Sequence, residues 1–141
     1  MQTSIEQVIE NFKTLVESNF DEINVVDFQK YGDAGLDKNG VQLIYDLEDN
    51  LGTYDLNVDT LNVHFEILDL LSTIQDPDER RKFVISDCNS IGSMLVSYIR
   101  NESAFTIQDS VNVTKVEKRY KDGLGGVEFN LTFTLQKTCL V

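Results

Sequence analysis

The sequence predicts a single α+β domain, in which two amphipathic helices pack on an antiparallel or mixed sheet of about five strands. Apolar residues recur at steps of three and four in two segments, which is the helical period. They alternate with mostly polar residues within 60–71 and strictly in 127–135, which is the strand period. A chain of 141 residues that is 41% hydrophobic is large enough for one core. The expected order over residues 1–141 is α-β-β-β-α-β-β.

The first helix has a clear start. Thr3 and Ser4 are N-cap candidates, and Glu6 and Gln7 follow them by three residues, as in a capping box. An apolar stripe then follows at helical spacing, so we expect a surface helix with one buried side. The stripe consists of Ile5, Val8, Ile9, Phe12, Leu15 and Val16.

Two strand-like segments follow at residues 23–28 and 41–47, both rich in β-branched and aromatic residues. The link between them ends in Asn39-Gly40, a pair that tolerates positive φ and commonly closes hairpins. Because the link is longer than a minimal hairpin, residues 31–40 are expected to project as a loop. A second polar, acidic loop is expected at residues 48–57.

Residues 60–71 alternate most clearly, with Leu61, Val63, Phe65 and Ile67 on the face expected to meet the core. A second helix is expected to begin at Asp76-Pro77, where the aspartate can cap and the proline suits the first helical position. It should run to about Ile99. Gly92 in its middle costs about 1 kcal/mol relative to alanine and suggests close approach of another element.

The last third is expected to be β structure. Phe105 and Ile107 open it, strand residues continue to Val116, and a turn follows at residues 121–123. The final strand, 127–135, places Val127, Phe129, Leu131, Phe133 and Leu135 on one face, so one side should be buried and the other wet.

No catalytic, cofactor or metal site is expected. The only histidine, His64, falls on the polar face of a strand beside Glu66, where a solvated side chain is the expected outcome. One histidine and two distant cysteines, Cys88 and Cys139, do not supply the four ligands of a structural zinc site. Residues 37–40 look like part of a calcium loop, but the flanking segments predict strands rather than helices. The chain is therefore not expected to be an enzyme.

Charge is the most informative global property. Residues 1–79 hold 18 acidic and 3 basic side chains, a balance of −15, whereas residues 80–141 hold 6 acidic and 9 basic ones, a balance of +3. The net charge of −12 argues against a nucleic-acid-binding surface, and the asymmetry favours head-to-tail contact between copies. The candidate inter-subunit contacts are the basic cluster Lys115, Lys118, Arg119 and Lys121 and the loop acids Asp33, Asp37, Asp46, Glu48 and Asp49.

No apolar run approaches the roughly 20 residues that span a membrane. The first residues show no secretory pattern, so an intracellular origin with no membrane contact is expected.

The order of these segments resembles a family of neck and tail-completion proteins of tailed bacteriophages, including the tail-terminator type. The resemblance covers most of the chain. It rests on the first helix, the polar-loop hairpin, the strand 61–69 ending in Leu-Asp, the helix that begins at Asp-Pro-Asp-Glu, and the Gly-led strand in 120–135. In the strand that ends in Leu-Asp, the long second helix and the Gly-led final strand, the chain is similar to virion proteins of Bacteroidetes-infecting, crAss-like phages.

The resemblance implies a structural virion protein, made in the host cytoplasm, that forms a homo-oligomeric ring in the head–tail connector, neck or tail-completion region. Copies would close with sixfold or twelvefold symmetry, next to portal, neck or tail proteins. Genome DNA would pass through the lumen without specific binding. The alternative interpretation is a small intracellular ligand-binding domain or an adaptor or chaperone.

Overall fold

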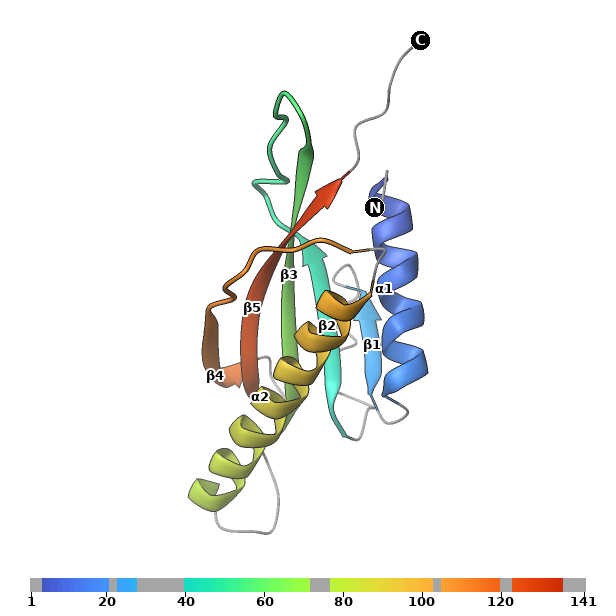
Figure 1. Cartoon of the computed structure of the whole chain (residues 1–141). Coiled ribbons are helices and arrows are strands. Elements are labelled where there is room, and N and C mark those ends of the chain that lie inside the picture. The colour runs from blue at the N-terminus through green and yellow to red at the C-terminus, as the bar shows by residue number, and fades with distance from the viewer. Residues whose placement is uncertain are drawn as a thin grey trace.

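The α+β class is confirmed by a computed structural model, which describes residues 4–20, 23–27, 40–71, 77–102, 105–119 and 123–135. Two helices pack on one face of a sheet whose main part is antiparallel (Figure 1). The strand order is β1-β2-β3-β5-β4. The elements are α1 (Ile5–Asn19), β1 (Asn24–Asp27), β2 (Gln42–Leu47), β3 (Asp59–Leu70), α2 (Pro77–Asn101), β4 (Val113–Arg119) and β5 (Leu124–Leu135).

Helix α1 begins at the predicted cap. Ser4 has extended backbone angles, and its hydroxyl oxygen accepts a hydrogen bond from the Gln7 amide at 3.2 Å. This contact satisfies one of the amides that a helix start leaves without an intrahelical partner. The buried side of α1 consists of Val8, Phe12, Leu15 and Val16, all members of the predicted stripe.

The antiparallel strands β3 and β5 form the centre of the sheet, and all 12 residues of each strand pair with the other. The predicted core face is confirmed, because the odd-numbered side chains in 61–67 and 127–133 are almost fully buried, although Leu135 at the end of β5 is only half-buried. Phe65 and Phe129 stack with their ring centres 5.5 Å apart. The ring centre of Phe12 in α1 lies 4.8 Å from that of Phe65. The buried side chains of this face are Leu61, Val63, Phe65, Ile67, Val127, Phe129, Leu131 and Phe133.

Helix α2 crosses β3 and β5, and Gly92 lies at the crossing (Figure 1). A Cβ atom at this position would lie 3.4 Å from both Ile67 Cδ1 and Phe129 Cε1, which explains the close approach expected from the sequence. Arg80 fastens the start of the helix, because its Nε and Nη2 atoms donate to the Leu70 carbonyl at 3.1 and 3.0 Å. Its Nη2 atom also lies 3.4 Å from Asp69 Oδ2.

The predicted hairpin between residues 23–28 and 41–47 is wrong. Strand β1 pairs with β2 in parallel, with Asn24 opposite Gln42. Parallel neighbours need a connection of a dozen or more residues, and residues 28–41 are long enough to carry the chain back to the same end. Gly40 does have the positive φ expected of it, 89°. Residues 31–39 of the first predicted loop lie outside the described residues.

Smaller differences concern the ends of elements. Helix α2 continues two residues beyond Ile99. Of the residues expected to open the C-terminal β structure, Ile107 forms only an isolated bridge to Phe133. Strand β4 proper begins at Val113 and contains an irregularity between Val116 and Arg119. Such a bulge bends an edge strand and discourages uncontrolled pairing.

The opposite face of the sheet carries a second, smaller core, although neither helix packs there. Its buried members come from β2, β3, β4 and β5, so part of the outer face is dry. This differs from the wet face expected from the sequence. The members are Ile44, Leu68, Val116 and Leu124, with Leu70 partly buried beside them.

Two glycine substitutions test this packing. We expect Gly92→Ala to raise the free energy of unfolding by up to about 1 kcal/mol, because it improves helix propensity and adds only ordinary contacts. Gly126→Ala should lower it by roughly 2 kcal/mol or more, because φ is +152° and the new Cβ would lie 2.0 Å from the Ile67 carbonyl oxygen. Urea unfolding of both variants measures this. Equal destabilisation of both would contradict the described crossing of α2.

Candidate functional site

Residues 48–58, called the arm below, extend past the end of the sheet between β2 and β3 (Figure 1). Backbone hydrogen bonds hold the arm against the first residues of β3. Thr60 donates to the Thr53 carbonyl at 2.9 Å, and Asn62 donates to the Leu51 carbonyl at 2.8 Å. Gly52 permits this contact, because a Cβ atom there would lie 1.9 Å from the Thr60 carbonyl oxygen. The arm is therefore an ordered extension of the β2–β3 pair.

The arm exposes apolar side chains at its tip. Tyr54 is 90% exposed and Leu56 is 88% exposed, while Leu51 is 42% exposed. Glu48, Asp49 and Asp55 make the same segment acidic, and it contains no lysine or arginine. Large apolar groups gathered on an ordered projection favour a contact with another surface.

A groove runs between α2 and the edge strand β4 on the helix-covered face of the sheet. It consists of two adjoining hollows of about 380 and 390 Å³ that share Asn89 and Val113. Val113 is 48% exposed, and the buried side chains of Val127 and Phe129 form part of the lining. Helix α2 lies mainly over β3 and β5 (Figure 1), and the exposed Val113 of β4 lines the groove beside it.

The charge of the groove is opposite to that of the arm. Lys82, Arg100 and Lys115 line it, and no carboxylate is among its lining residues in the described part of the chain. Two of these cations also have local partners. Lys115 Nζ lies 3.2 Å from Glu117 Oε1, and Arg100 Nη2 donates to the Asp109 carbonyl at 2.7 Å.

The predicted contact residues do not gather in one place. Lys115 lies inside β4 and lines the groove. Asp46 belongs to β2, where its Oδ1 accepts a hydrogen bond from the Leu47 amide at 2.7 Å. Glu48 and Asp49 begin the arm. Lys118 and Arg119 end β4, while Asp33, Asp37 and Lys121 lie outside the described residues.

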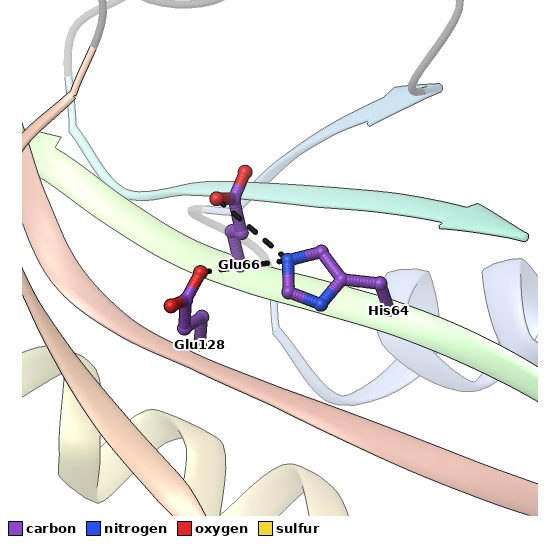
Figure 2. A group of neighbouring side chains, drawn as sticks. All are labelled: His64, Glu66 and Glu128. Carbon is purple, nitrogen blue, oxygen red and sulfur yellow. Dashed lines mark ion pairs between the residues drawn. The ribbon is translucent and has the colours of Figure 1, made fainter. Parts of the chain in front are cut away.

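A polar cluster occupies the outer face of the sheet (Figure 2). His64 and Glu66 are two residues apart on β3, so they share one face. The register places Glu128 of β5 directly opposite Glu66, and Asn130 opposite His64. Asp46 of β2 is paired with His64 from the other side.

The imidazole of His64 lies among carboxylates. Its Nε2 atom is 3.8 Å from Glu66 Oε1 and 3.6 Å from Glu128 Oε2, while its Nδ1 atom is 3.5 Å from Glu48 Oε1. Figure 2 shows Nε2 turned toward both carboxylates. The hydrogen bond to Glu66 raises the pKa of His64 above 6.5, with smaller contributions from Asn130 and Glu48, although desolvation by burial acts in the opposite direction.

The side-chain amide of Asn130 contacts the other ring nitrogen of His64, Nδ1, and determines whether that nitrogen donates or accepts a hydrogen bond. Either its oxygen or its nitrogen can lie 2.6 Å from Nδ1. With the nitrogen toward the ring, the amide also donates to Glu48 Oε1 at 2.8 Å and to the Phe129 carbonyl at 3.3 Å, so this orientation fits its neighbours better. Nδ1 then accepts, and the ring proton resides on Nε2, facing the glutamates.

The expectation of a solvated His64 on a polar face is wrong. The His64 side chain is 20% exposed, and that of Glu66 is fully buried. The strand alternation correctly placed both on the face away from the main core, but it carried no sign that this face has a buried part of its own. No sequence pattern predicted that Glu128 and Glu48 would lie beside His64. The pairing of β3 with β5 brings Glu128 there, and the base of the arm brings Glu48.

The buried thiol of Cys88 offers no nucleophile. Burial, with Asp69 and Asp87 nearby, raises its pKa to about 12. The reactive thiolate is therefore scarce at neutral pH. Cys139 lies outside the described residues.

The sequence matches no protein-family model, and no curated protein is similar to it. Neither helix in the described part of the chain combines the length and apolar character needed to cross a membrane.

The exposed tip of the arm predicts a specific stability result. We expect the double substitution Tyr54→Ser and Leu56→Ser to change the free energy of unfolding by no more than about 0.5 kcal/mol, as for other surface changes. Leu61→Ser, at a fully packed position a few residues on, is the matched control and should cost several-fold more. Thermal and urea unfolding at low protein concentration measure both. A large loss from the arm variant would mean that its tip packs within its own subunit.

Proposed function

We propose that this chain is a structural subunit that assembles head to tail with copies of itself, the arm of one copy entering the α2–β4 groove of the next. The observation that carries the proposal is the ordered arm with Tyr54 and Leu56 almost fully exposed. Burying these two side chains in a partner would contribute roughly 1.5–3 kcal/mol each. No catalytic activity is part of the proposal.

The groove is the complementary surface for three reasons. It offers apolar contact through Val113 and the side chains beneath it. Its lining carries three cations, of which Lys115 pairs with Glu117, and no carboxylate among the described residues, whereas the arm carries three acids and no base. Opposite potentials of this kind steer association and fix its register. The β4 edge beside the groove is also available for further contacts.

The two surfaces lie at different places on the molecule. The arm extends beyond one end of the sheet (Figure 1), while the groove lies between α2 and the edge strand β4. A contact between unlike surfaces is heterologous, and its repetition generates a closed ring when the rotation permits closure. In such a ring, the sheet of about five strands, with β1 included, would form the body of each subunit.

The setting we propose is the neck or tail-completion region of a tailed bacteriophage, with portal, neck or tail proteins as neighbours and with sixfold or twelvefold closure. The support is the layout resemblance of the sequence, together with the acidity of residues 1–79. An acidic lumen repels DNA phosphates and would let a genome pass without adhering.

Mixing two complementary variants tests head-to-tail assembly. Tyr54→Asp disables the arm, and Val113→Glu disables the groove by adding a charge to an exposed position. We expect each variant alone to be monomeric, because each lacks one of the two surfaces. Their mixture should form one-to-one heterodimers, since one intact arm and one intact groove remain. Size-exclusion chromatography with light scattering and native mass spectrometry measure this.

Phe83→Ser is the matched control, since Phe83 is an exposed aromatic residue outside both the arm and the lining of the groove. It should assemble as the wild type does. A wild-type chain that stays monomeric at high concentration contradicts self-assembly. Assembly that both variants leave intact contradicts the assigned surfaces.

The acidic lumen makes a second prediction. Purified rings should not retain double-stranded DNA at physiological salt, because the net charge of −12 per chain repels the phosphates. Electrophoretic mobility and fluorescence anisotropy with a labelled duplex measure retention. Tight binding under these conditions would exclude the proposed passage of DNA.

A further inference from the structure

The polar cluster on the outer face has a property that assembly through the arm does not use. Three donor atoms of the kinds that transition metals prefer converge there: His64 Nε2 and one carboxylate oxygen each from Glu66 and Glu128. All three atoms lie within 4.8 Å of one another. The nitrogen is 3.6 Å from one of the oxygens and 3.8 Å from the other.

We propose that His64, Glu66 and Glu128 bind a divalent transition-metal ion, with Zn²⁺ the best match. The proposal is independent of the assembly function. Zinc bonds to nitrogen and oxygen ligands are about 2.1 Å long, which places neighbouring ligands of a tetrahedral site about 3.4 Å apart. The nitrogen–oxygen distances exceed that value by only a few tenths of an ångström, whereas the two carboxylate oxygens lie within 4.8 Å of each other and must move closer for an ion to bind.

The sheet holds these ligands in place. His64 and Glu66 share a face of β3, and Glu128 projects from the paired position of β5 in the middle of a regular ladder. Glu66 is fully buried, which restricts its rotamers. Sites built on strands keep their geometry better than sites on loops. His64 and Glu128 are 20% and 25% exposed, so solvent can reach the site and complete the coordination of the ion.

Electrostatics also favours a cation here. Glu66 and Glu128 are directly opposite each other, and like charges in that position destabilise a pair of strands. A divalent ion between them converts this repulsion into attraction. The metal would take the place of the proton on Nε2.

The second ring nitrogen already has partners for the metal-bound form. When a metal occupies Nε2, the ring proton moves to Nδ1 and needs an acceptor. Glu48 Oε1 lies 3.5 Å away, and a turn of the Asn130 amide would present its oxygen at 2.6 Å. Outer partners of this kind fix the tautomer of a ligating histidine and strengthen its bond to the metal.

The donor set selects the type of ion. Imidazole with two carboxylates suits Zn²⁺ and its first-row neighbours, whereas Mg²⁺ and Ca²⁺ prefer oxygen donors alone. We therefore expect saturable binding of one Zn²⁺ per chain and much weaker binding of Mg²⁺ or Ca²⁺.

The test uses the full chain without an affinity tag, after treatment with a chelator. Isothermal titration with ZnCl₂ should give one site. Because the chain contains a single histidine, its imidazole ¹⁵N signals are unambiguous. Zn²⁺ should shift the Nε2 signal to that of a metal-bound nitrogen and leave Nδ1 protonated. Saturable binding that leaves the histidine signals unchanged would overturn the proposal, as would the absence of one-to-one binding.

The substitution Glu128→Gln tests metal binding without disturbing the fold. It should weaken Zn²⁺ binding at least about tenfold, because it replaces a charged ligand. The metal-free variant should be about as stable as the wild type, because the loss of the ion pair with His64 is offset by the removal of one of two opposed carboxylates. Glu10→Gln, on the exposed side of α1, is the control for non-specific binding to an acidic surface and should bind Zn²⁺ as the wild type does. Equal affinity in all three proteins would place the ion elsewhere.

Discussion

The pairing of β3 with β5 determines the rest of the structure. It joins Asp59 to Leu135 at one end and Leu70 to Leu124 at the other without a shift in register. Because side chains alternate across a sheet, this one ladder sorts the residues of both strands between two faces. The odd-numbered residues meet the helices, and the even-numbered ones form the outer face with its polar cluster. A slip of one residue would bury His64 against α1 and α2 and expose Phe65.

The sequence predicts local features well where one physical cause dominates. Strict alternation in 61–67 and 127–133 identified the buried face, because only one placement hides every large apolar side chain. The cap at Ser4 and the start of α2 at Pro77 follow from the needs of a helix terminus. Gly92 indicated a close approach of another element, because a glycine in the middle of a helix lowers stability relative to alanine. The structure places Ile67 and Phe129 beside it.

The positions of residues that are distant in the sequence were harder to predict. Asn39-Gly40 favoured a hairpin on local turn chemistry, but β1 and β2 are parallel, and pairing direction depends on the path of a whole connection. His64 was expected to be solvated because its strand neighbours alternate regularly. Two of the three carboxylates around it, Glu48 and Glu128, come from positions 16 residues before and 64 residues after, and only the completed sheet brings them to His64. Exposure of the arm tip is likewise a property of the folded chain.

The arm and the polar cluster depend on the same strand. The first residues of β3 hold the arm through Thr60 and Asn62, and the next outward-facing residue, His64, contacts Glu48 at the base of the arm. Thr132 of β5 donates to the Asn62 side chain at 2.9 Å, which connects the base of the arm to the strand that carries Glu128. An ion that draws His64 toward β5 would therefore act on the base of the arm through Glu48 and Asn130.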